Sequence, residues 1–192
     1  MDDLAEGVNH DRERNILKSK KQRTLTITLF VVYTLLLVGI ILFKLPFYSE
    51  KISDGIRVVN LIPFTGSFDQ NGALFPREIF YNILLFIPLG IYISMLKSQW
   101  PFIKKSLTVI GISLSFEVLQ LIFALGRTDI TDLIDNTLGG IIGLGIYALL
   151  LRICKAKTVR VTNIIALVVT VCVVWRFSQL FYLSHFVMGR LP

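Results

Sequence analysis

The sequence contains few of the side chains on which many hydrolases and metalloproteins depend, with two cysteines and two histidines in 192 residues. Cys154 and Cys172 have no spacing typical of a metal site, and neither lies in a context that favours a disulfide. His10 and His185 lie near the two ends of the chain. These shortages argue against a histidine-dependent phosphatase and against a Ser–His–Asp hydrolase in the apolar part of the chain.

Charged residues are also scarce, at 17% of the chain, whereas 54% of the residues are apolar and the mean hydropathy is +0.68. Soluble domains average about 25% charged residues. A helix needs ~20 residues to cross the ~30 Å hydrocarbon core of a bilayer. The apolar stretches of sufficient length are Leu25–Phe43, Ile79–Leu96, Ser106–Leu125, Leu133–Leu151 and Val161–Leu183. The sequence therefore predicts an all-α, polytopic membrane helix bundle with about five transmembrane helices.

Acidic residues are missing from two connections between these stretches, residues 97–105 and 152–160. Both connections, like the N-terminal tail, are rich in lysine and arginine, which accumulate on the cytoplasmic side of membrane proteins. This pattern predicts a cytoplasmic N-terminus and an extracytoplasmic C-terminus. The net charge of +7 is then a topology signal and a basis for contact with anionic membrane lipids, and nucleic acid is not an expected partner.

We expect a basic cytoplasmic tail over residues 1–24, a five-helix membrane domain over 25–183, and an extracytoplasmic C-terminus over 184–192. The first apolar stretch is too long for a cleavable signal peptide, and no small-x-small cleavage site follows it. The outer loop over 44–78 is long for a compact membrane protein. Its apolar segment Asn60–Phe64 is interpreted as a lid or a partly inserted segment.

Polar residues occur at the start of the fourth apolar stretch, where Asp132, Asp135 and Asn136 have helical spacing and share one face. A carboxylate at the centre of a bilayer costs ~2.5–3.5 kcal/mol, so such residues are by default a functional-site hypothesis. Gly139 and Gly143 follow them at a spacing that lets another helix backbone approach closely, which is in most cases a packing feature.

The predicted topology also sets the depth of two isolated charges. With 1.5 Å of rise per residue, Glu117 lies roughly 12 Å and Arg176 roughly 10 Å from the outer ends of their helices. Because an unpaired charge at that depth is costly, we predict that Glu117 and Arg176 interact directly or through water.

The charges on the outer side are nearly balanced. The acids are Glu78, Glu117, Asp129, Asp132 and Asp135, and the bases are Arg57, Arg77, Arg127 and Arg176. One interpretation is a structural ion-pair network. The other is a site for a zwitterionic or anionic headgroup, with arginines holding the anion and a carboxylate acting as general base. The apolar lid and the clustering on one side favour the site.

This interpretation yields two sets of candidates. The candidate catalytic residues are Glu117, Asp132 and Asp135. The candidate ligand-binding residues are Arg57, Asn60, Glu78, Asn82, Gln120, Arg127, Asp129, Asn136 and Arg176. Asp129, Asp132 and Asp135 also have a spacing that would suit a divalent cation, but three acids at this spacing occur by chance on helices. No cofactor or metal is therefore expected.

Four motifs in this order resemble the VanZ-like family. They are Asn60-Leu-Ile-Pro63-Phe64, then Glu78 with Asn82-Ile-Leu-Leu-Phe86-Ile-Pro88-Leu-Gly90, then Glu117-x-x-Gln120, and finally Arg127-x-Asp129-x-x-Asp132-x-x-x-Asn136-x-x-Gly139-Gly140-x-x-Gly143. The resemblance covers about residues 57–145. It implies a small multi-pass protein of the bacterial plasma membrane and cell envelope, in a family whose namesake accompanies glycopeptide-resistance genes and resembles a teicoplanin-resistance factor.

Two functions remain open. The first is a non-enzymatic protein that binds a lipid-linked cell-wall precursor, a lipid headgroup or a lipoglycopeptide at the outer leaflet and limits drug access. The second is a membrane-embedded enzyme acting on a lipid or precursor headgroup, with Glu117 or an aspartate as base and Arg127 as anion clamp. A transporter is disfavoured because the sequence has no internal repeat.

Overall fold

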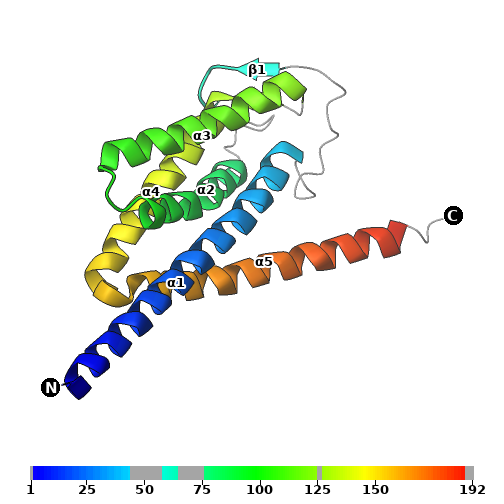
Figure 1. Ribbon diagram of the computed structural model, residues 1–192. Helices are drawn as coiled ribbons and strands as arrows, with labels where there is room; N and C mark the ends of the chain where they lie inside the picture. Colours follow the sequence, from blue (N-terminus) through cyan, green and yellow to red (C-terminus); the bar gives the residue numbers. More distant parts are fainter. Residues whose placement is uncertain (1, 44–57, 65–75, 125–126, 189–192) are drawn as a thin grey trace. The chain divides into compact units, whose positions relative to one another are not determined.

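The computed structural model describes residues 2–43, 58–64, 76–124 and 127–188. Its helices are α1 (Asp2–Phe43), α2 (Pro76–Leu96), α3 (Phe102–Phe123), α4 (Ile130–Cys154) and α5 (Thr158–Met188), with the short 3-10 helix η2 (Lys155–Lys157) between the last two (Figure 1). Two three-residue strands, β1 (Val58–Asn60) and β2 (Arg127–Asp129), complete the described structure.

Four segments of these helices are long and apolar enough to cross a membrane: Ser19–Leu42, Arg77–Leu96, Phe102–Phe123 and Ile130–Gln179. The all-α membrane bundle is thus confirmed. The fourth segment runs through α4, η2 and α5, and its 50 residues far exceed the ~20 that one crossing needs. Lys155, at the break, has a positive φ of 47°. The count of five crossings and the sides of the termini stay predictions.

The chain divides into two compact units, one of residues 1–33 with 156–192 and one of residues 34–155. In the first unit, α1 is helical from Asp2, so the expected tail continues directly into the first apolar stretch. The two helices of this unit are joined by polar side chains. Asn163 is fully buried, accepts a hydrogen bond from Thr26 Oγ1 (2.9 Å) and donates one to Gln22 Oε1 (2.9 Å).

The second unit has α2 and α4 packed backbone against backbone. A Cβ atom added at Gly139 would overlap the carbonyl oxygen of Ile83, and one added at Gly143 would overlap that of Ile87. A Cβ added at Gly90 of α2 would in turn overlap the Gly140 carbonyl oxygen. The close helix approach predicted from Gly139 and Gly143 is confirmed, and the helix that approaches is α2.

Helix α3 covers the other side of α4. Val109, fully buried, lies against the position that a Cβ of Gly140 would take. The core of this unit also contains an edge-to-face pair between Phe86 of α2 and Phe116 of α3, with ring centroids 6.1 Å apart. Three helices therefore form a tight packing unit with small residues on α4 at its centre.

The strands β1 and β2 pair in parallel, with Val58 opposite Arg127 and Asn60 opposite Asp129. This pairing was not predicted, since both segments were expected to be plain connections. It places the residues that precede Pro63 directly beside the start of α4. The segment around Asn60 is thereby attached to α4, the helix that carries Asp132 and Asp135.

Candidate functional site

Asp129 is the centre of a polar cluster at the start of α4. Its Oδ1 accepts a hydrogen bond from the backbone N–H of Thr131 (2.9 Å), which makes it the N-cap of α4. Its Oδ2 accepts from Asn60 Nδ2 (2.9 Å), and its own backbone N–H donates to Glu117 Oε2 (3.1 Å). Asp129 and Glu117 are both buried. One aspartate therefore joins β1, α3 and α4.

The segment Asn60–Phe64 is attached to the same helix end by its backbone. The Phe64 N–H donates to Thr131 Oγ1 (2.9 Å), and the Ile62 N–H donates to Asn60 Oδ1 (3.2 Å). Phe64 has a φ of 64°, a left-handed conformation that is uncommon outside glycine. Leu61 and Ile62 are 72% and 65% exposed, so these apolar side chains are directed away from the cluster.

Two more of the predicted residues connect helices. Asn82 Nδ2 of α2 donates to Asp132 Oδ1 of α4 at 2.6 Å. Gln120 Nε2 of α3 donates to the carbonyl oxygen of Ile41 at the end of α1 (3.1 Å). Asn82 and Asp132 therefore join the N-terminal parts of α2 and α4, and Gln120 joins α3 to the end of α1.

Helices α3 and α4 carry buried oxygen atoms that have no hydrogen-bond partner among the described residues. These are Ser113 Oγ and Gln120 Oε1 on α3, and Asp135 Oδ2 and Asn136 Oδ1 on α4. Ser113 is fully buried, and Asp135 and Asn136 are 3% and 2% exposed. An unsatisfied buried polar group costs about 1–3 kcal/mol, so four of them on one pair of helices favour the binding of a further group.

The register of α3 and α4 places Ser113, Asp135 and Asn136 at one level. The contact from Glu117 to Asp129 lies at the start of α4, and the contact from Val109 to Gly140 lies about three turns further along α4. The two helices therefore run antiparallel. Ser113 lies between these contacts on α3, and Asp135 and Asn136 lie between them on α4. Because Asp135 and Asn136 offer acceptor oxygens, the group that fits there is a hydrogen-bond donor.

The remaining candidate residues are Glu78, Arg57, Arg127 and Arg176. Glu78 lies in the first turn of α2 and is half-buried. Arg57 and the side chain of Arg127 lie outside the described residues, although the Arg127 backbone belongs to β2. Arg176 of α5 donates to Gln179 Oε1 of its own helix at 3.4 Å. The interaction of Glu117 with Arg176 stays a prediction.

The expectation that no divalent cation binds at the three aspartates stays a prediction. Asp129 is engaged by Asn60 and Thr131, and Asp132 by Asn82. Within the described ranges, no group of three or more His, Cys, Asp or Glu side chains is arranged to hold a metal ion.

Sequence reasoning missed Thr131 as a member of the cluster and left Ser113 out of the candidate residues. Thr131 follows Asp129 at the spacing of a helix cap, and Ser113 lies one turn before Glu117, so both had a local signal.

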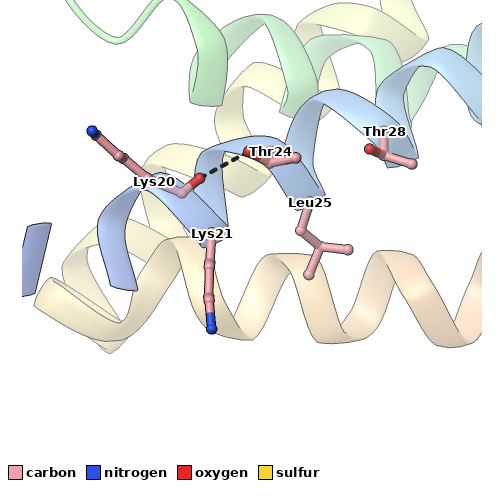
Figure 2. A pocket seen from close by; sticks show the side chains of 5 residues that line it. All are labelled: Lys20, Lys21, Thr24, Leu25 and Thr28. Atoms are coloured by element: carbon pink, nitrogen blue, oxygen red, sulfur yellow. Dashed lines mark hydrogen bonds between the residues drawn. The ribbon is translucent and has the colours of Figure 1, made fainter. Parts of the chain in front are cut away.

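A separate hollow lies on α1, lined by Lys20, Lys21, Thr24, Leu25 and Thr28 (Figure 2). It is formed by successive turns of one helix and contains no carboxylate.

Comparisons with known proteins identify the family to which this sequence is similar. The family model described as VanZ/LLP1 matches residues 30–152. This range contains the residues of the polar cluster around Asp129. The chain is also 39% identical over 124 residues to "Protein VanZ" of Enterococcus faecium, a match that covers 63% of this chain and 72% of that protein. No solved structure matches.

Proposed function

The chain belongs to the VanZ/LLP1 family, and from this we propose that it is a multi-pass protein of the bacterial plasma membrane that contributes to resistance against teicoplanin-type glycopeptides. It acts by binding a lipid-linked cell-wall precursor, a lipid headgroup or the lipoglycopeptide itself. The binding site is the polar cluster at the outer ends of α2, α3 and α4. A bound precursor or lipid headgroup becomes less accessible to the drug. A bound drug molecule becomes less able to reach its target.

The observation that carries this proposal is the set of buried, unpartnered oxygens of Ser113, Asp135 and Asn136. Acceptor oxygens in a low-dielectric interior strongly favour a donor. Hydroxyl, amide and ammonium groups are such donors, and sugar and peptide headgroups carry many of them. The surrounding bonds from Asn60, Asn82 and Glu117 keep the cluster in place, which is the support that a binding site needs.

We expect substitutions of the unpartnered residues to remove resistance without unfolding the protein. In a susceptible Gram-positive host, Asn136→Leu and Ser113→Ala should lower the inhibitory concentration of teicoplanin towards that of the empty vector. The oxygens removed have no hydrogen-bond partner among the described residues, so an apolar side chain of similar size leaves no described group unsatisfied. Membrane abundance and melting temperature should therefore change little.

Ser115→Ala is the matched control, because Ser115 is exposed and its hydroxyl donates to the Gly111 carbonyl oxygen of its own helix (2.7 Å). This variant should keep the resistance of the parent protein. Equal resistance in the Ser113, Asn136 and Ser115 variants would contradict a binding site between α3 and α4.

The alternative is a membrane-embedded enzyme that modifies a lipid or precursor headgroup. Asp135 favours it, because a buried carboxylate oxygen without a described partner is suited to take a proton from a substrate hydroxyl. Glu117 and Asp132 each accept a hydrogen bond within the protein, which leaves them less available as bases.

Asp135→Asn separates the two functions. The amide keeps the size and one acceptor oxygen of the side chain but cannot act as a base at neutral pH. A catalytic role predicts that resistance falls to the vector level and that an altered headgroup or muropeptide disappears from lipid and cell-wall mass spectra. Retained resistance in Asp135→Asn and Asp132→Asn, with unaltered spectra in parent cells, would exclude the catalytic version.

A further inference from the structure

A cluster of positive charge surrounds Trp100 at the opposite end of α2 and α3. Lys104 Nζ lies 4.3 Å and Lys97 Nζ 5.2 Å from the centroid of the Trp100 ring. A third lysine, Lys105, places its Nζ 3.5 Å from the Ser98 carbonyl oxygen. We call Lys97, Trp100, Lys104 and Lys105 the Trp100 cluster. It lies wholly within the unit of residues 34–155.

The turn that forms the Trp100 cluster is ordered by backbone hydrogen bonds. The Lys97 N–H donates to the Ile93 carbonyl oxygen (2.9 Å), and the Trp100 N–H donates to the Lys97 carbonyl oxygen (3.0 Å). The Lys105 N–H donates to the Pro101 carbonyl oxygen (3.2 Å). The lysines are thus carried by a short, closed turn, and the aromatic ring fixes where two ammonium groups gather.

This concentration of charge has no negative counterpart nearby in the chain. The sequence from residue 79 to residue 116 contains no aspartate or glutamate. Among the described residues, the contacts recorded for the three ammonium groups go to Trp100 and to a backbone carbonyl rather than to a carboxylate. Like charges held on one ring repel each other, so an external anion would stabilise the arrangement.

Apolar side chains next to the cluster indicate where that anion comes from. Phe102, Ile103 and Leu107 are 58%, 70% and 61% exposed. They begin the candidate span Phe102–Phe123, and the span Arg77–Leu96 ends just before Lys97. The cluster therefore lies at the end of two membrane-crossing segments, at the depth of lipid phosphates, with an acyl-chain surface directly adjacent.

We propose that the Trp100 cluster binds the phosphate of an anionic phospholipid, with the acyl chains against the apolar start of α3. A zwitterionic lipid is a poorer ligand because its own ammonium group would add to the uncompensated charge. A soluble phosphate is also a poorer ligand because it would leave Phe102 and Ile103 without a partner. This site is separate from the outer polar cluster, and the inference does not depend on the proposed function.

Trp100 itself can report the binding, since the chain has two tryptophans and Trp175 is exposed on α5. The full chain carrying Trp175→Phe is placed in phosphatidylcholine nanodiscs. Brominated phosphatidylglycerol or brominated phosphatidylcholine is then added at equal mole fractions, and the quenching of Trp100 is recorded. Each lysine near an anionic surface contributes about a fivefold gain in lipid binding, so the phosphatidylglycerol should quench at a much lower mole fraction.

Lys97→Gln combined with Lys104→Gln should remove most of this preference, and the double arginine variant at the same positions should retain it. Both lysines are exposed, so the fold should be kept, as a melting curve can verify. The control is Lys20→Gln with Lys21→Gln on α1, which removes the same charge from exposed positions of the other compact unit. It should leave the preference unchanged.

Three results would overturn the proposal. The first is equal quenching by the two brominated lipids in the parent protein. The second is an equal loss of preference in the α1 control, which would mean general charge attraction. The third is complete displacement of the brominated phosphatidylglycerol by millimolar glycerol phosphate, which would mean that a soluble anion is the ligand.

Discussion

Gly143→Ala and Gly139→Ala are expected to destabilise the protein by on the order of 2–3 kcal/mol each, the size of an overpacking defect in a tight core. The added methyl group at either position would overlap a backbone carbonyl oxygen of α2. A backbone atom cannot rotate away as a side chain can, so the two helices must separate. The separation would also withdraw Asn82 from Asp132, because that hydrogen bond joins the same two helices.

The measurement is the melting temperature of the purified protein in detergent, together with the amount of folded protein in membranes. Gly145→Ala is the matched control, because a Cβ at Gly145 meets no other atom within 4 Å. Alanine is favoured over glycine inside a helix by roughly 0.5–1 kcal/mol, so the control should be neutral or slightly stabilising. Equal melting temperatures for all three variants would show that α2 and α4 do not pack through these glycines.

Asp129→Ala is expected to release the segment Asn60–Phe64 and to abolish resistance. The change removes the N-cap of α4, which is worth about 0.5–2 kcal/mol, and leaves the amide of Asn60 without its acceptor. Asp129→Asn keeps an oxygen for the Thr131 N–H and should retain most of the capping contribution. The two variants thus separate helix capping from the attachment of the segment.

Hydrogen–deuterium exchange over residues 58–64 measures this release directly. In the parent protein, the parallel pairing of β1 with β2 and the bond from the Phe64 N–H to Thr131 should slow exchange. In Asp129→Ala, exchange should be faster by one to two orders of magnitude, as expected for a local stability loss of about 1.4–2.7 kcal/mol. Unchanged protection in that variant would show that Asp129 does not hold the segment.

The features that the sequence predicts well are those with a short-range signal. Apolar stretches of sufficient length predict the membrane helices, and the four-residue spacing of Gly139 and Gly143 predicts a close helix contact. The motif resemblance predicts the family, which the matches confirm. For the helices and the glycines the information lies within one helix, and for the family it lies in the order of four short motifs along the chain.

The features that escape prediction join distant parts of the chain. The bond from Asn60 to Asp129 connects residues 69 positions apart, and β1 and β2 have three residues each, too few for an alternating pattern. Asp132 and Asp135 share a helix face in the sequence, but the structure gives Asp132 the amide of Asn82 and leaves an oxygen of Asp135 without a described partner. The neighbours that decide this come from α2 and α3.

The interpretation of the segment Asn60–Phe64 as a lid or a partly inserted segment stays a prediction. Its Leu61 and Ile62 side chains are largely exposed. The attachment of this segment comes from Asn60 and from backbone N–H groups instead. Composition describes which side chains a segment has, whereas hydrogen-bond geometry decides which of them turn inward.

The parallel pairing of β1 with β2 also sets an order of events during synthesis of the chain. Residues 58–60 leave the ribosome well before residues 127–129, and α2 and α3 lie between them. The first strand therefore has no partner until α2 and α3 have been synthesised. The Asn60 amide can meet Asp129 only after that stage, so this hydrogen bond reports that the chain between residues 60 and 129 has folded back on itself.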